Sequence, residues 1–277
     1  MSKRVVVTDP ASAPLADFVA LSDPETRRQV ERDGNYFVVE GILAIERLLD
    51  LPHWHLRGLA LLPRVADRLA PRLAGLPDDV IVAIADEDVL RAVVGFDIHR
   101  GALASVERVA PAPAASLTVG SGLFVAAEGL NDHENLGSLY RNAAAFGAGA
   151  VLLDPTCADP FYRRSVRVSL GHVLAVPTGR LDPLPGGLHQ LHELGATTVA
   201  LTPQADLALR DLDRAALGPG PVVLLVGAEG PGLSDVARAT ATYRVSIPMA
   251  AGVDSLNVAT ATAIALHHLA SSRAPAT

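Results

Sequence analysis

Three stretches decide the fold of this chain: NLGSLYRNAAAFG (Asn135–Gly147), LLVGAEGPGLS (Leu224–Ser234) and VSIPMAAGVDSLNVA (Val245–Ala259). Each has an apolar strand next to a glycine-bearing or polar loop, and two of them run directly into a helix. A repeated succession of strand, loop and helix is typical of proteins with a mostly parallel sheet. The sequence therefore predicts an α/β fold for the second half of the chain.

The same alternation extends outward from these stretches. The predicted strands are apolar runs more than alternating patterns, which indicates a parallel sheet covered on both faces. Strands are expected at Leu123–Ala126, Ala150–Leu153, Thr198–Leu201, Val222–Val226 and Arg244–Ile247, and helices at Asn135–Ala145, Arg163–Leu170, Leu188–Leu194, Ser234–Thr240 and Ser255–Leu269.

The first half of the chain predicts a smaller α/β unit that follows a poorly patterned lead-in of about 20 residues. A Pro/Ala-rich stretch, APAPAAS (Ala110–Ser116), is expected to be a stiff, extended linker. We therefore expect an N-terminal domain over 1–109, a linker over 110–116 and a second domain over 117–277. The first domain is expected to hold strands at Tyr36–Val39, Leu56–Leu62, Val80–Ala85 and Ala102–Val106, and helices at Pro24–Arg32, Glu40–Leu49, Val65–Leu73 and Asp88–Val94.

Composition limits the classes of protein to which the chain can belong. With 277 residues, 49% hydrophobic and 19% charged, the chain can build a substantial core. No run of about 18 apolar residues predicts a membrane span, and MSKRVVVTDP lacks the apolar centre of a signal peptide, so we expect a cytoplasmic protein. A single cysteine, Cys157, excludes an internal disulfide and a cysteine zinc cluster. We expect no metal.

The charge balance bears on nucleic-acid binding in two ways. The net charge of −7 argues against a generic binder, although local clustering of basic residues counts for more than the total. Lys3 is the single lysine among the 23 basic residues, and the others are arginines. This excess of arginine either suits contacts with phosphates or reflects a GC-rich genome. Arg163, Arg164 and Arg167 stand beside Phe161 and form either an RNA-contacting cluster or a solvated helix face.

The candidate site residues each have a functional and a structural interpretation. Asn131 or Asp132 is placed to start a helix on which Arg141 is either a functional or a solvated residue. The loop after Val226 carries Gly227, Gly230 and Gly232, which permit close approach to a ligand or form an ordinary turn. Their spacing departs from G-x-G-x-x-G, which disfavours a nicotinamide-dependent oxidoreductase. The last motif places Ser255 as an N-cap of the final helix, and that role alone would explain it.

In order and spacing, the three stretches resemble the motifs of the SpoU/TrmH family (SPOUT superfamily) of RNA 2′-O-ribose methyltransferases. The first motif matches at Asn135, Gly137 and Arg141, and the third at the triplet Ser255-Leu256-Asn257. The second reads Gly-Ala-Glu-Gly where the family usually has Gly-Asn-Glu-Gly, so Ala228 lacks the amide that would brace the loop. The resemblance covers about 122–270.

The resemblance implies methyl transfer from S-adenosyl-L-methionine to a ribose 2′-hydroxyl of structured RNA, with rRNA preferred over tRNA. It implies a catalytic role for Arg141, which we expect to orient the ribose and stabilise the alkoxide because arginine is a poor base. The other implied catalytic residues are Asn135, Glu229, Ser255 and Asn257. The implied cofactor contacts are Leu201, Thr202, Gly227, Glu229, Gly230, Ile247, Met249, Ser255 and Leu256, and the implied RNA contacts are Arg100, Arg163, Arg164 and Arg167.

The resemblance also implies an architecture. The second domain would be a trefoil-knotted SPOUT domain that forms a homodimer, and the first a substrate-binding domain like ribosomal protein L30e, with Glu40, Gly41 and Arg100 as landmarks. The alternative from another class is a non-catalytic RNA-binding protein that retains the fold, which the Ala228 departure favours. Hydrolase and NTPase functions find no support, since G-x-S-x-G and a P-loop lysine are absent.

Overall fold

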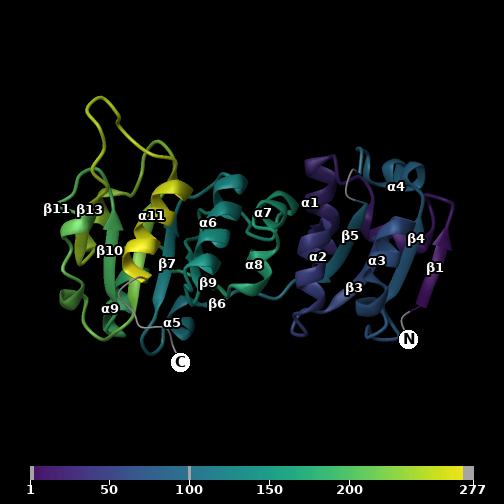
Figure 1. Ribbon diagram of the computed structural model, residues 1–277, viewed down its shortest axis with the longest axis horizontal. Coiled ribbons are helices and arrows are strands. Elements are labelled where there is room, and N and C mark those ends of the chain that lie inside the picture. Colours follow the sequence, from purple (N-terminus) through teal and green to yellow (C-terminus); the bar gives the residue numbers. More distant parts are fainter. Residues whose placement is uncertain (1–2, 99–100, 271–277) are drawn as a thin grey trace. The chain divides into compact units, whose positions relative to one another are not determined.

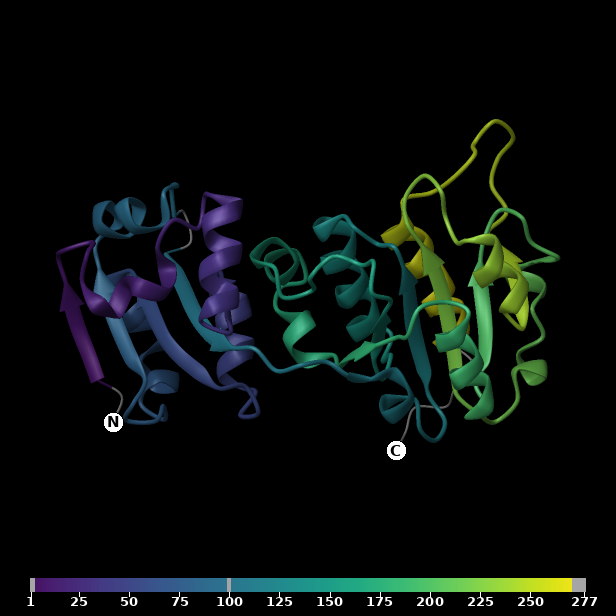
Figure 2. The same ribbon diagram turned by 180° about the vertical axis from the view of Figure 1, so that it is seen from behind.

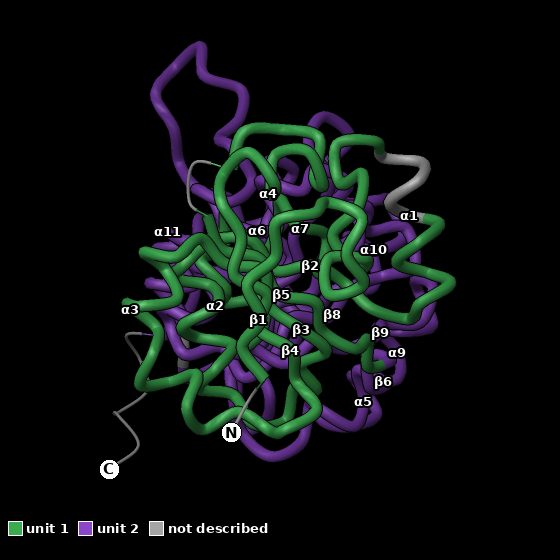
Figure 3. The backbone as a smooth tube through the Cα atoms, turned by 90° about the vertical axis from the view of Figure 1, so that its right-hand side faces the viewer, with its two compact units in different colours: residues 1–109, 161–174 green, residues 110–160, 175–277 purple. Residues whose placement is uncertain are grey.

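The structure, a computed structural model, describes residues 3–98 and 101–270, and the chain divides into two compact units. Unit 1 comprises residues 1–109 and 161–174, and unit 2 comprises residues 110–160 and 175–277 (Figure 3). The segment Phe161–Leu174 therefore belongs to unit 1, although unit 2 contains its sequence neighbours on both sides. Within the described residues, no helix is long and apolar enough to cross a membrane.

A parallel sheet forms the centre of unit 2. Its eight strands lie in the order β11-β13-β10-β12-β7-β8-β9-β6, and every pairing is parallel. The strands therefore all end at one edge of the sheet, where Gly227 of β12 lies in register with Glu128 of β7. The strands are β6 (Ala112–Pro113), β7 (Leu123–Glu128), β8 (Val151–Leu153), β9 (Thr178–Arg180), β10 (Thr197–Leu201), β11 (Leu207–Ala208), β12 (Val222–Gly227) and β13 (Tyr243–Ser246).

Helices cover both faces of this sheet (Figures 1 and 2). Helices α6 and α11 pack against each other on one face, and α5, α9 and α10 lie on the other. Alternate side chains of each strand point to opposite faces, so Phe124 and Ala126 of β7 pack with Leu188 and Leu191 of α9. The helices are α5 (Ala114–Leu117), α6 (His133–Ala145), α9 (Gly186–Glu193), α10 (Asp235–Thr240) and α11 (Val258–Ala270), with 3-10 turns η2 (Leu209–Asp211) and η3 (Arg214–Leu217).

The prediction of a parallel sheet buried on both faces is confirmed, and the predicted strands and helices of the second half are present. The expectation of an extended linker over Ala110–Ser116 was wrong. Ala112–Pro113 pairs with β9 as strand β6, and α5 follows at once, with Ala114 buried in the core cluster. Alanine suits a helix as well as a linker, and contacts with β9 decide between the two here.

Unit 1 contains a mixed five-stranded sheet in the order β1-β4-β3-β5-β2. Strand β1 pairs in parallel with β4, whereas β5 is antiparallel to β2 and β3. The expectation of an unpatterned lead-in was wrong, because KRVVV forms this edge strand and leaves Val6 76% exposed. The elements are β1 (Lys3–Val7), η1 (Ala13–Phe18), α1 (Pro24–Asp33), β2 (Tyr36–Glu40), α2 (Ile42–Leu49), β3 (Leu56–Leu61), α3 (Pro63–Leu73), β4 (Ile81–Ala85), α4 (Glu87–Val94) and β5 (Ala102–Glu107).

The segment Phe161–Leu174 completes the core of unit 1. It contains α7 (Arg163–Val168) and begins α8 (His172–Ala175). The ring of Phe161 lies 4.9 Å from that of Phe37 and 5.3 Å from that of Trp54, measured between centroids. The Trp54 indole N–H donates to the carbonyl of Leu174 at 2.9 Å. Unit 1 thus buries aromatic surface against a segment more than a hundred residues away in sequence.

Candidate active site

A cavity of about 400 Å³ lies in unit 2 at the carboxyl ends of β10, β12 and β13. Crevices at the carboxyl ends of parallel strands are the usual ligand sites of α/β sheets. The wall comes from the loop after β12, from the turn after β10 and from the long segment between β13 and α11. All of the predicted cofactor contacts lie in this wall, namely Leu201, Thr202, Gly227, Glu229, Gly230, Ile247, Met249, Ser255 and Leu256.

The loop after β12 is a tight glycine hairpin, which we define as residues 227–232. The N–H of Gly232 donates to the carbonyl of Ala228 at 3.0 Å, and these residues form an isolated antiparallel bridge. A side chain at Gly227 would begin 2.2 Å from the carbonyl carbon of Gly232, so only glycine fits there. Gly230 and Gly232 adopt positive φ angles of 86° and 71°. The hairpin therefore presents bare backbone to the cavity.

Asn257 connects the hairpin to two helices. Its side-chain Oδ1 accepts the N–H groups of Ala259 at 3.0 Å and Thr260 at 3.2 Å, so Asn257 is the N-cap of α11. Its Nδ2 donates to Oδ1 of Asn135 at 2.7 Å and to Oε1 of Glu229 at 2.9 Å. The cap needs an acceptor, so the amide group is left to donate, and this fixes its orientation.

The expectation that Ser255 caps the final helix was therefore wrong. Helix α11 begins at Val258, and Ser255 lies two residues before the actual cap, where it lines the cavity with an exposed side chain. Asparagine and serine are both good caps, and the sequence SLN offers both, so local preference could not decide between them.

Helix α6 carries two predicted residues, and neither lines the cavity, although Asn135 bonds to Asn257 in the cavity wall. Asp132 caps the helix by accepting from the N–H groups of Glu134 and Asn135, which confirms one of the two predicted starts. Asn135 is 8% exposed and bonded to Asn257. Arg141 lies six residues along, is exposed, and is absent from the cavity wall. Residues six apart on a helix differ by about 240° in direction, so their separation follows from the geometry.

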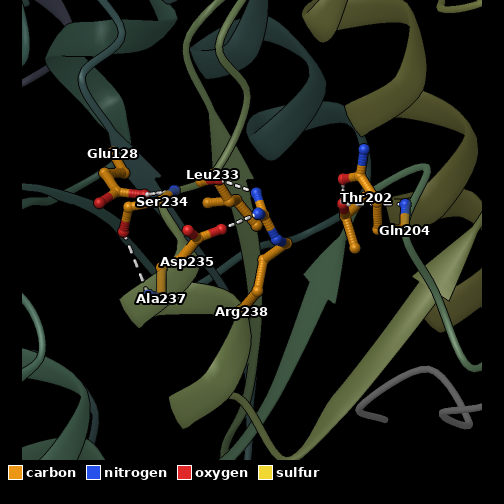
Figure 4. A network of polar contacts seen from close by, with 8 residues as sticks. All are labelled: Glu128, Thr202, Gln204, Leu233, Ser234, Asp235, Ala237 and Arg238. Atoms are coloured by element: carbon orange, nitrogen blue, oxygen red, sulfur yellow. Dashed lines mark hydrogen bonds and ion pairs between the residues drawn. The ribbon is translucent and has the colours of Figure 1, made fainter.

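Two residues that the sequence did not single out make further side-chain contacts, and one of them lines the cavity. Arg238 of α10 lines the cavity, and its guanidinium donates to the carbonyl of Leu233 and to the carboxylate of Asp235 (Figure 4). Asn142 ties α6 to α11 through a 2.8 Å bond from its Nδ2 to the carbonyl of Ala259. The Arg238–Asp235 pair has the i,i+3 spacing that a sequence can indicate, whereas the Asn142 contact depends on tertiary packing and has no local signal.

The predicted RNA contacts of α7 lie within unit 1. Arg163 and Arg167 both bind the carboxylate of Glu40, at 3.0 Å and 3.3 Å, and Glu40 is only 8% exposed. The Arg163 guanidinium also lies 4.3 Å from the ring centroid of Phe96. Arg164 is exposed. These bonds give Arg163 and Arg167 a structural role in unit 1. The fourth predicted contact, Arg100, lies outside the described residues.

The loop after β8 braces the entry to α6. Asp154 accepts the N–H of Gly129 at 3.0 Å, and the Cys157 thiol accepts the N–H of Leu130 at 3.3 Å. Burial, and then its hydrogen bond with Asp154, raises the pKa of the Cys157 thiol to about 12. The thiol is therefore protonated and unreactive at neutral pH. Among the described residues, no three His, Cys, Asp or Glu side chains gather as metal ligands would.

Known proteins define the class to which this fold and cavity belong. Residues 122–267 match the model of the SpoU rRNA Methylase family, and the chain belongs to that family. The match spans β7 to α11 and so contains the whole cavity. The mixed α/β fold agrees with this assignment.

Relatives and solved structures extend the similarity over both units. An uncharacterized tRNA/rRNA methyltransferase of Mycobacterium tuberculosis is 41% identical over 266 residues, which cover 94% of this chain and 90% of the relative. The 23S rRNA (guanosine-2′-O-)-methyltransferase RlmB of Ralstonia nicotianae is 34% identical over 186 residues, 66% of this chain and 73% of its own length. The crystal structure of an AdoMet-bound rRNA methyltransferase from Sinorhizobium meliloti matches with a TM-score of 0.80 at 26% identity, covering 96% of this chain and 97% of that one.

Proposed function

We propose that the protein transfers a methyl group from S-adenosyl-L-methionine to a ribose 2′-hydroxyl of structured RNA in the cytoplasm, with rRNA as the first candidate and tRNA as the second. The observation that carries the proposal is the 2.9 Å bond between Asn257 and Glu229, which joins two of the three family motifs at one cavity. The name of the Ralstonia relative supports ribose methylation of rRNA, and the AdoMet-bound neighbour supports the cofactor.

The cavity fits S-adenosyl-L-methionine in size and chemistry. Its volume of about 400 Å³ lies in the usual range for small-molecule sites. Leu201, Ile247 and Leu256 offer apolar surface for an adenine ring, and the glycine hairpin offers backbone that a ligand can approach closely. Glu229 and Arg238 line the same cavity, so it holds charges of both signs for a zwitterionic amino-acid end. The bound cofactor supplies a methyl group that its sulfonium has already activated, and no metal is required.

The protein's own contribution is mainly positioning. The Asn257 amide holds Asn135 of α6 and Glu229 of the hairpin in one bonded chain, which fixes the cavity wall against the first motif. We assign Arg141 to orienting the ribose and stabilising the oxyanion that develops at its 2′ position. Because a guanidinium stays protonated at neutral pH, it serves this role better than that of a base.

The exposed position of Arg141 outside the cavity wall supports a homodimer in which a second copy brings Arg141 to the cavity. We infer this arrangement, a trefoil knot in unit 2 and an L30e-like RNA-binding role for unit 1 from the family resemblance. RNA contacts from Arg163, Arg164 and Arg167 of α7 and from Arg100 belong to the same proposal, although Arg163 and Arg167 both bond to Glu40 and Arg163 also lies over Phe96.

Complementation between two inactive variants tests the proposal. Arg141→Ala removes the guanidinium, and Gly227→Ala forces a side chain into backbone 2.2 Å away, which disrupts the hairpin. If Arg141 acts on the partner's cavity, mixed dimers have one intact site, and random exchange in an equal mixture restores about a quarter of wild-type methylation. No recovery would place Arg141 in its own chain's site, and full activity of Arg141→Ala would remove it from catalysis.

The alternative is a non-catalytic RNA-binding protein, which the Ala228 departure favours because alanine has no side-chain polar atom to brace the hairpin. Calorimetry with S-adenosyl-L-methionine separates the two functions. Binding supports the methyltransferase, and its absence supports the alternative. Mapping ribose methylation in total RNA with and without this gene then identifies the modified nucleotide.

A further inference from the structure

The glycine hairpin needs bracing, and the residue next to its first glycine cannot provide it. Position 228 is alanine, with no polar side-chain atom. Its methyl group faces the turn after β7, because a side chain built on Gly129 would begin 3.7 Å from it. A polar residue at 228 could bond to that turn, whereas alanine only touches it. Bracing of the hairpin must therefore come from other groups.

Glu128 supplies a bond at the point where the hairpin closes. It is the last residue of β7 and lies in register beside Gly227, where the hairpin begins. Its Oε2 accepts the backbone N–H of Ser234 at 2.8 Å, just beyond the end of the hairpin (Figure 4). The Glu128 carboxylate therefore ties the exit of the hairpin at Ser234 to β7, the strand that pairs with the start of the hairpin at Gly227. Bonds from ionised acceptors are about twice as strong as neutral ones.

The exit of the hairpin is anchored on its other sides as well. Ser234 caps α10 by accepting the N–H of Ala237 at 3.1 Å, so its own N–H is left for Glu128. Arg238 bonds to the carbonyl of Leu233, which is 3% exposed. Glu128 thus joins this anchored exit to β7 by a hydrogen bond, beside the packing of Leu233 in the core cluster.

We propose that Glu128 is a positioning residue that holds the glycine hairpin closed against the cavity, in place of a polar side chain at position 228. The proposal rests on the proposed function for its effect on cofactor affinity, and on the structure alone for its effect on the hairpin. It predicts that losing the carboxylate loosens residues 227–237 and weakens cofactor binding more than it slows turnover, because the hairpin forms the cavity wall.

Hydrogen exchange and calorimetry on the full-length protein test this. In Glu128→Ala, we expect the Ser234 amide to exchange about 10-fold faster, and the dissociation constant of S-adenosyl-L-methionine to rise about 10-fold, with kcat changed less than KM. Glu128→Gln keeps a neutral acceptor at the same place and is expected to show a smaller effect in both measurements. Glu193→Ala is the matched control, because Glu193 is an exposed carboxylate on α9, away from the cavity.

The outcomes separate the inference from the proposed function. Unchanged exchange at Ser234 together with unchanged cofactor affinity in Glu128→Ala would overturn the role of Glu128, even if the wild type methylates RNA. A wild type that binds no cofactor would overturn the proposed function, while faster exchange of the Ser234 amide in Glu128→Ala would still support the role of Glu128 in holding the hairpin. If the alanine variant fails to fold, Glu128→Gln carries the test, and wild-type exchange and affinity there would overturn the inference.

Discussion

Replacing Asn257 should separate two roles that one side chain performs. Its carbonyl oxygen caps α11, and its amide nitrogen links Asn135 to Glu229. Asn257→Ala removes both roles. Asn257→Asp keeps the acceptor, and a carboxylate is favourable at a helix N-terminus. The aspartate cannot donate, however, and it brings a second negative charge next to Glu229.

The magnitudes follow from these contacts. Loss of an N-cap costs about 1 kcal/mol. Two side-chain hydrogen bonds add about 0.5–1.5 kcal/mol each, and the exposed one to Glu229 should lie at the low end. Asn257→Ala should therefore lower the free energy of unfolding by about 2–3 kcal/mol, which corresponds to roughly 4–12 °C in Tm. Asn257→Asp should lose less stability, because the cap survives, and yet lose cofactor binding as the hairpin separates from α6.

Urea unfolding and calorimetry with S-adenosyl-L-methionine on both variants measure the two effects. Ser255→Ala is the stability control, since Ser255 caps no helix, and we expect its unfolding free energy to stay within about 0.5 kcal/mol of wild type. The reasoning is refuted if Ser255→Ala destabilises the protein as much as Asn257→Ala does. It is also refuted if Asn257→Asp binds the cofactor like wild type, because the donor role would then have no consequence.

Three further predictions concern charges elsewhere in the chain. Glu40→Gln leaves the two α7 arginines without their shared carboxylate and should lower the free energy of unfolding, measured in urea, by about 2 kcal/mol. Glu46→Gln breaks an exposed pair with Arg68 and should lower it by under about 1 kcal/mol. Equal losses in the two variants would contradict the structural role of Glu40. Because its pKa is raised to about 12, Cys157 should be alkylated about a thousandfold more slowly at pH 8 in the native than in the unfolded chain, and rapid native labelling would count against this. Arg180→Ala should weaken RNA binding in filter assays and lower the slope of the logarithm of the binding constant against the logarithm of salt concentration by about 1. Arg244→Ala is the control and should leave this slope unchanged, because the Arg244 guanidinium is already paired with Asp206.

The sequence could predict what local pattern determines. Buried strands such as β12 are continuous apolar runs, and Asp132 has the side chain and position of an N-cap. Strands without a continuous apolar run were missed, because β9 reads TGR and β1 leaves Val6 in solvent, whereas the equally short β8 is fully buried and was predicted. Such segments become strands through hydrogen bonds from a neighbour, and periodicity carries no signal for that.

For the candidate site, the sequence could indicate the residues of the cavity wall but not the hydrogen bonds that hold them. The wall of the cavity lies at strand ends, where the motifs resemble the family, so its residues could be named in advance, although their binding roles stay predictions. The bonds that hold the wall could not be named. Glu128 reaches Ser234 across 106 positions, and Asn257 reaches Asn135 across 122. Likewise, nothing near Phe161 in sequence indicates that it packs on Phe37 of unit 1.

The acidity of the chain is compatible with RNA binding once the arginines are sorted by their partners. Most arginine side chains that the structure describes bond to a carboxylate or a backbone carbonyl, so those guanidinium groups are held within the fold. Arg141 and Arg180 are exposed, and their side chains have no hydrogen bond or ion pair with another described residue. Arg180 ends β9 at the same sheet edge as the cavity, three strand spacings or roughly 14 Å from β12. Guanidinium groups without a side-chain partner among the described residues are available for phosphates, and we expect Arg141 and Arg180 to add to the salt dependence of RNA binding beside the proposed contacts of α7.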